Sequence, residues 1–75
     1  MKEPLLPHLT SRGLEVLRLL ADGMSSDEVA GILGITTATV MFHYRGTEKH
    51  YGTLNRTHTV VEALRCGDIA FRPLD

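Results

Sequence analysis

Apolar residues recur near the start of the chain at the spacing of a helix with one broad buried stripe. They fall between Thr10 and Asp22, and they are Leu14, Val16, Leu17, Leu19, Leu20 and Ala21. Thr10 is a candidate N-cap, but Gly13 stands where a capping box needs Glu or Gln. Gly23 provides a C-terminal stop. The pattern predicts a helix from about Thr10 to Asp22 with a weak start.

The clearest local signal begins at Ser25, which Glu28 follows three residues later as an intact capping box. Four apolar residues continue this short helix, and they are Val29, Ala30, Ile32 and Leu33. Gly34 then stops it. The sequence therefore predicts a second helix between Ser25 and Gly34.

Two more helices follow. Thr36 is a candidate N-cap for a helix from about Thr37 to Tyr51, which Gly52 ends. Gly46 inside it costs about 1 kcal/mol relative to Ala, so this helix needs packing to hold it. The fourth helix is capped by Asn55 and terminated by Gly67, and its apolar residues are Val60, Val61, Ala63 and Leu64.

The second and third helices are joined by the short turn Gly34-Ile35-Thr36, which is typical of a helix-turn-helix. We therefore expect an all-α fold, a compact four-helix bundle containing a helix-turn-helix, over residues 9–75. Ile69 and Phe71 are expected to fold back onto the core. Residues 1–8, with two prolines and no period, are interpreted as a flexible lead-in or the end of a linker.

Size and composition argue against catalysis. A chain of 75 residues has room for one core and little room for a deep, water-excluding pocket. No Ser/His/Asp set, paired-carboxylate cleft or phosphate-binding glycine loop is present, and Asp27 and Glu28 are interpreted as first-turn charges that favour the helix dipole. We expect a protein that is not an enzyme and that uses no cofactor.

The sequence also disfavours a metal site, a disulfide and a membrane-spanning helix. The histidines His43, His50 and His58 give no three-ligand set on one helix face, so no metal is expected. A single cysteine, Cys66, leaves no intramolecular disulfide and fits a reducing cytoplasm. No apolar stretch approaches the ~20 residues of a membrane helix. The expected location is the cytoplasm.

Charge is unevenly distributed. The net charge is −1, which disfavours nucleic-acid binding, because phosphate neutralisation supplies much of the affinity. Between residues 36 and 61, however, there is one acid, Glu48, against three cations: Arg45, Lys49 and Arg56. This segment is mildly basic and its flanks are acidic, so binding to DNA stays open.

Several blocks of sequence, taken in order, resemble the LuxR/GerE-type helix-turn-helix domain of quorum-sensing regulators and response regulators. The resemblance runs from Leu9 to Ile69. Its blocks are Leu9-Thr10-Ser11-Arg12 with Glu15-Val16-Leu17, Ala21-Asp22-Gly23-Met24-Ser25, Glu28-Val29-Ala30, Leu33-Gly34-Ile35, Thr39-Val40 with His43, Asn55-Arg56-Thr57 and Ala63-Leu64-Arg65-Cys66-Gly67. Each block is weak alone, but the series is specific.

The resemblance implies sequence-specific binding to double-stranded DNA for transcription regulation, with the third helix in the major groove. The residues expected to contact DNA are Thr37, Thr39, Met41, Phe42, His43, Arg45 and Lys49. Among them Met41, Phe42 and Arg45 point towards base edges, and Arg45 suits bidentate bonding to guanine. Thr37 and Thr39 either reach phosphate oxygens or serve as helix caps alone. His43 and Lys49 are placed near the DNA backbone.

The fourth helix is implied as the contact of a homodimer on DNA. The candidate residues are Thr59, Val60, Ala63 and Leu64. Some of these must equally belong to the core, because so small a domain buries most of its apolar residues. RNA polymerase is a further expected partner, and a membrane is not.

The chain departs from the usual family pattern at four positions. Met41 replaces a basic residue, Gly46 an Asn, Thr47 an Ile and Tyr51 a Leu. These changes predict low DNA affinity or an unusual site preference, with Met41 making apolar contact with thymine methyl groups. The alternative hypothesis is a degenerate helix-turn-helix domain that acts as a protein-interaction module.

Overall fold

The computed structural model describes residues 9–70 of the chain, and four helices account for most of them. In chain order they are α1 (Ser11–Ala21), α2 (Ser26–Leu33), α3 (Thr37–Tyr51) and α4 (Arg56–Arg65). Within this range there is no strand, so the all-α prediction is confirmed. The predicted lead-in at residues 1–8 and the predicted packing of Phe71 lie outside the described residues.

Each helix begins at the side chain that the sequence predicts. Thr10 accepts a 3.0 Å hydrogen bond from the backbone N–H of Gly13. Ser25 and Glu28 form the full capping box, with bonds of 3.1 and 2.8 Å. Thr36 and Asn55 cap α3 and α4 in the same manner. The starts of all four helices are therefore set by local side chains.

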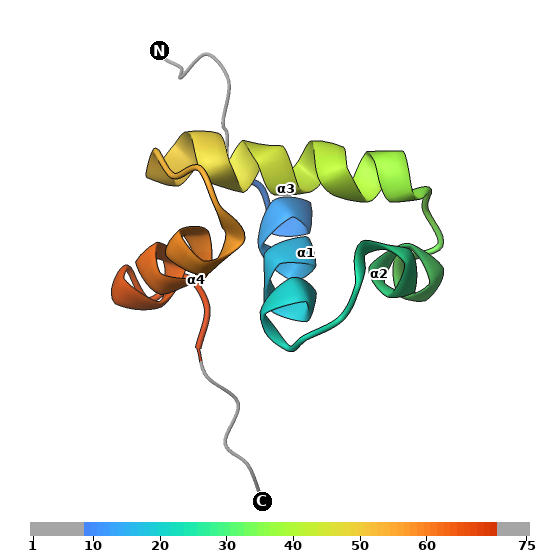
Figure 1. Cartoon of the computed structure of the whole chain (residues 1–75), viewed down its shortest axis with the longest axis horizontal. Coiled ribbons are helices and arrows are strands. Elements are labelled where there is room, and N and C mark those ends of the chain that lie inside the picture. The colour runs from blue at the N-terminus through green and yellow to red at the C-terminus, as the bar shows by residue number, and fades with distance from the viewer. Residues whose placement is uncertain (1–8, 71–75) are drawn as a thin grey trace, which may run out of the picture.

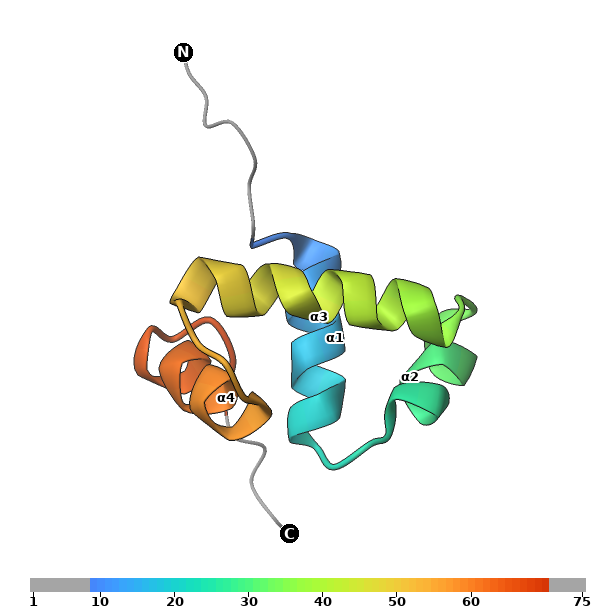
Figure 2. The ribbon, with the colours of Figure 1, turned by 45° about the horizontal axis from the view of Figure 1, so that its top comes forward.

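The third helix, α3, lies across one end of α1, and α2 and α4 flank α1 on the same side of α3 (Figure 1). The turned view shows the same arrangement (Figure 2). The core lies between the helices and comprises Val16, Leu17, Leu20, Val29, Ala30, Val40, Tyr44, Ala63 and Ile69. The predicted return of Ile69 to this core is confirmed.

At Gly13 the helix α1 lies close to α3. A Cβ atom at this position would lie 3.2 Å from the Thr10 hydroxyl oxygen and 3.4 Å from the carbonyl oxygen of His43. A longer side chain, such as the Glu of a capping box, would meet α3. The missing capping box of α1 thus has a tertiary cause: the position faces a neighbouring helix.

The junction of α3 and α4 is unusually polar for a core. Thr47, Thr53 and Thr59 are buried there. Thr47 donates to the carbonyl oxygen of Tyr44 at 2.6 Å, and Thr59 donates to the carbonyl oxygen of Asn55 at 2.8 Å. The hydroxyls of Thr53 and Thr59 also bond to each other. Each buried hydroxyl is thus satisfied, as burial requires.

Candidate nucleic-acid interface

Helix α3 has one side in the core and one side in solvent. The buried residues Val40, Tyr44 and Thr47 recur at helical spacing and face the other helices. At about 100° per residue the opposite side carries four exposed residues, which we call the outer stripe. The outer stripe consists of Ala38, Phe42, Arg45 and Lys49.

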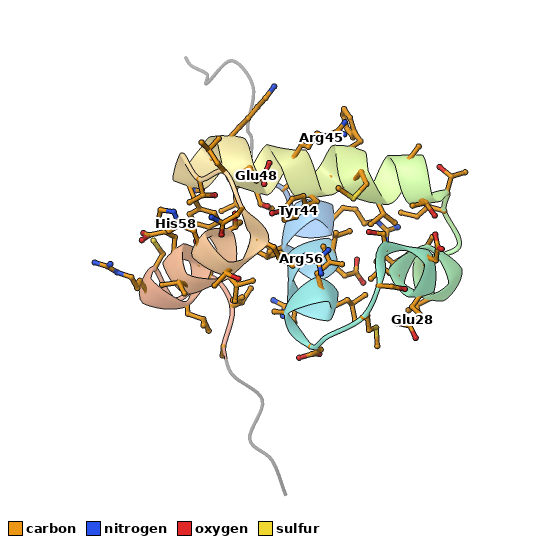
Figure 3. All side chains as sticks on the ribbon, viewed as in Figure 1. Glu28, Tyr44, Arg45, Glu48, Arg56 and His58 are labelled. Carbon is orange, nitrogen blue, oxygen red and sulfur yellow. The ribbon has the colours of Figure 1, made fainter. Side chains whose placement is uncertain are left out.

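The charges of α3 are separated between these two sides. Arg45 points away from the other helices, whereas Tyr44 and Glu48 lie on the side that faces them (Figure 3). The hydroxyl of Tyr44 donates a 2.8 Å hydrogen bond to the Glu48 carboxylate. Burial raises the pKa of Tyr44, and the neighbouring Glu48 carboxylate adds to the rise. The hydrogen bond with Tyr44 therefore keeps the Glu48 carboxylate away from the cationic outer stripe.

Two of the predicted DNA-contacting residues lie at the start of α3. Thr37 donates a 2.8 Å hydrogen bond to Asp27 of α2. Thr39 shares a 2.9 Å hydrogen bond with the Thr36 hydroxyl, and its backbone N–H is capped by the same oxygen at 3.1 Å. Both hydroxyls thus stabilise the turn between α2 and α3. Their contact with phosphate stays a prediction.

Met41 lies on the flank of α3 that faces α2, off the outer stripe. Its sulfur accepts a 3.4 Å hydrogen bond from the Ser26 hydroxyl, and its side chain packs against the core. His43 lies on the other flank and is half-buried. Its ring meets that of Phe42 edge to face, with the centroids 5.5 Å apart. The structure therefore brings Phe42, Arg45 and Lys49 together and places Met41 apart.

The candidate dimer residues of α4 divide into two groups. Thr59 and Ala63 have no exposed surface and belong to the core. Val60 and Leu64 are half-buried and line a small hollow of about 50 Å³ together with Arg18 of α1. Val61, which is not among the candidate dimer residues, is 43% exposed. An apolar surface on α4 is thus formed by Val60, Val61 and Leu64, and periodicity alone did not separate it from the core.

Two further properties concern residues 9–70 only. No group of three or more His, Cys, Asp or Glu side chains in this range is placed to hold a metal ion. No helix in the same range is long and apolar enough to cross a membrane.

Comparison with known proteins places this arrangement in a family. Residues 7–63 match the model for bacterial regulatory proteins of the luxR family, which is more than half of the chain. The chain is 38% identical over 60 residues to the transcriptional activator protein PhzR of Pseudomonas fluorescens. It is 39% identical over 59 residues to the HTH-type quorum-sensing regulator RhlR of Pseudomonas aeruginosa. These matches cover 80% and 79% of the chain but 25% and 24% of the two relatives, so the chain spans about a quarter of their length.

Solved structures of two regulatory proteins have the same fold as this chain. The transcription factor GerE superimposes with a TM-score of 0.78 at 30% identity, covering 84% of this chain and 94% of GerE. The response regulator ChrA of a heme-sensing two-component system gives a TM-score of 0.79 at 31% identity, covering 89% of this chain and 33% of ChrA. The resemblance noted in the sequence is thus confirmed: the chain belongs to the luxR family of bacterial regulatory proteins, and its helices form that family's DNA-binding helix-turn-helix domain.

Proposed function

We propose that this chain binds duplex DNA in a sequence-specific manner to regulate transcription, with α3 lying in the major groove. The observation that carries the proposal is the outer stripe, an exposed helix face that no other part of the described fold uses. An α-helix fits the major groove of B-DNA, where each base pair presents a distinct pattern of donors and acceptors. The names of PhzR and RhlR as regulators support the same role.

The electrostatics of the domain favour this face. Arg45 and Lys49 are exposed, and within residues 9–70 neither forms an ion pair. Two acids are already engaged inside the domain: Glu62 pairs with Arg65 on α4, and Glu48 accepts the hydrogen bond of Tyr44. The net charge of −1 is therefore compatible with a locally cationic α3. We assign Arg45 to guanine and Lys49 to phosphate.

We further propose that two copies bind together through α4. Val60, Val61 and Leu64 form the apolar surface for this contact, and the buried Thr59 and Ala63 support it from the core. A two-fold dimer would place its two α3 helices on half-sites about one helical turn apart. RNA polymerase stays a predicted partner.

Fluorescence anisotropy tests DNA binding directly. The whole chain is titrated at several salt concentrations with duplexes that it selects from a random-sequence pool, beside Arg45→Ala. Arg12→Ala is the matched control, because it removes the same charge from a partly exposed side chain on α1, outside both α3 and α4. Arg45→Ala should cost about 1–3 kcal/mol of binding free energy when the contact is to a base, and Arg12→Ala should cost far less. Equal losses in the two variants would contradict docking through α3.

Absence of DNA binding would favour the alternative hypothesis. If no duplex binds even at low salt, the protein-interaction module becomes the better explanation of the fold.

Dimerisation is tested by sedimentation of the chain on duplex DNA, comparing the wild type with Val61→Glu. A charge at this exposed apolar position should leave the fold intact and leave one copy per duplex where the wild type has two. An unchanged stoichiometry would exclude Val61 from the contact.

A further inference from the structure

Phe42 is a large aromatic side chain that the domain leaves in solvent. It is 71% exposed, although burying such a ring would be worth roughly 1.5–3 kcal/mol. The other large apolar residues that are exposed within residues 9–70 lie outside α3: Ile32, Leu54 and Val61. The outer stripe thus carries one aromatic ring, between the small Ala38 and the cationic Arg45.

The spacing of Phe42 and Arg45 fits two neighbouring base pairs. Residues three apart lie side by side on a helix face. Their Cα atoms are separated by about 4.5 Å along the helix axis, at a rise of about 1.5 Å per residue. Stacked base pairs are about 3.4 Å apart. A helix in the major groove would therefore present the ring and the guanidinium to successive pairs.

The ring of Phe42 is also partly held in place. His43 meets it edge to face, with ring centroids 5.5 Å apart. Aromatic pairs prefer this geometry. A ring that is ordered before binding loses less conformational freedom when it binds. The contact with His43 therefore suits Phe42 to a role in recognition.

We propose that Phe42 and Arg45 together read a step in which a pyrimidine with a 5-methyl group adjoins a guanine. This inference rests on the proposed function. A phenyl ring packs against the methyl group that thymine presents in the major groove, and an Arg bonds to O6 and N7 of guanine. The 5-methyl group of 5-methylcytosine lies at the same place. The sequence suggests Met41 for the contact with the methyl group, but Met41 packs towards α2. We therefore assign this contact to Phe42.

Removal of single methyl groups tests the proposal. Duplexes that the whole chain selects from a random pool are remade with uracil in place of each thymine next to a guanine, and binding is measured by fluorescence anisotropy. One such replacement should weaken binding about fourfold, the value expected for the burial of one methyl group. Replacing the same thymine pair by a cytosine pair should weaken binding, and 5-methylcytosine there should restore part of the loss.

Phe42→Ala isolates the ring. The substituted residue is exposed, so the variant should keep its fold, which circular dichroism checks. This variant should bind thymine and uracil duplexes equally. Ile32→Ala is the matched control, because Ile32 is 57% exposed on α2 and should leave the fourfold difference intact.

The outcomes separate the two proposals. If the chain binds selected duplexes but treats thymine and uracil alike, the role of Phe42 is wrong and the proposed function stands. The same conclusion follows if Phe42→Ala keeps the fourfold difference. If no duplex is bound at low salt, the proposed function fails and this inference fails with it.

Discussion

The hydroxyl of Tyr51 donates a 2.6 Å hydrogen bond to the Asp68 carboxylate, which joins the last turn of α3 to the turn that follows α4. Burial raises the pKa of Tyr51, and the Asp68 carboxylate adds to the rise. The folded protein thus favours the neutral phenol. The resemblance implies Leu at position 51, and a Leu could not form this hydrogen bond.

Replacing Tyr51 by Phe should lower the free energy of unfolding by about 1 kcal/mol at neutral pH. Because the pKa is raised in the folded state, the stabilisation is complete below the ordinary Tyr pKa of about 10 and is lost as the pH rises above it. Urea unfolding of the wild type and Tyr51→Phe at about pH 7 and above about pH 10 measures this. Both proteins keep Tyr44, so their difference reports Tyr51. A difference that does not shrink at high pH would contradict the prediction.

The buried pair of Thr53 and Thr59 should respond asymmetrically to substitution. Thr59 gives its proton to the carbonyl oxygen of Asn55, so Thr53 must be the donor in the bond between them. Thr59→Val leaves the buried Thr53 hydroxyl without its acceptor and should cost about 1–3 kcal/mol. Thr53→Val should cost less, because the Thr59 hydroxyl still donates to the carbonyl oxygen of Asn55. The double variant should cost less than the sum. Thermal unfolding of the three variants tests this, and equal single losses would refute the direction of the bond.

The hydrogen bond between Tyr44 and Glu48 should favour DNA binding, because it keeps the Glu48 carboxylate away from the outer stripe. Tyr44→Phe frees the Glu48 carboxylate, whose charge can then approach the phosphates. Binding should become about two to five times weaker, the range of an exposed charge interaction. Glu48→Gln in the same background should restore the affinity. Anisotropy at low and moderate salt measures both, and a loss that Glu48→Gln fails to reverse would point to a change in fold.

Gly13→Gln should destabilise the domain although it completes a capping box in the sequence. The new side chain would meet α3, and overpacking of this kind costs about 1–3 kcal/mol. Gly31→Gln is the control. A side chain at Gly31 of α2 meets open space, so it should gain up to about 1 kcal/mol from helix propensity. Urea unfolding compares the two variants, and stabilisation at both sites would show that α1 can move away from α3.

These predictions concern features that local sequence does not reveal. The helix starts at Ser25, Thr36 and Asn55 could be predicted because a cap involves residues three apart. Gly13 could not be explained in this way, because the space for its side chain is limited by α3, a helix distant in sequence. Side-chain type also indicates burial poorly: the resemblance implies a dimer contact for Thr59, yet this residue is fully buried with its hydroxyl bonded.

The candidate site was predicted in composition but not in orientation. Arg45 and Lys49 follow from the cationic character of the segment and from the resemblance. The flank occupied by Met41 depends on where α2 packs, and the side occupied by Glu48 depends on its bond with Tyr44. Both are tertiary facts, because helical spacing fixes the angles between residues and leaves the direction of the core to packing.

Because α3 crosses the end of α1, the residues of α3 that face the core and those that face solvent are different sets. Val40, Tyr44 and Thr47 tie the helix to the bundle, whereas Phe42 and Arg45 take no part in the core. Substitutions on the outer stripe should therefore cost little stability. Under the proposed function, the DNA sequence that the domain prefers can change through these residues while the inner side of α3 stays the same.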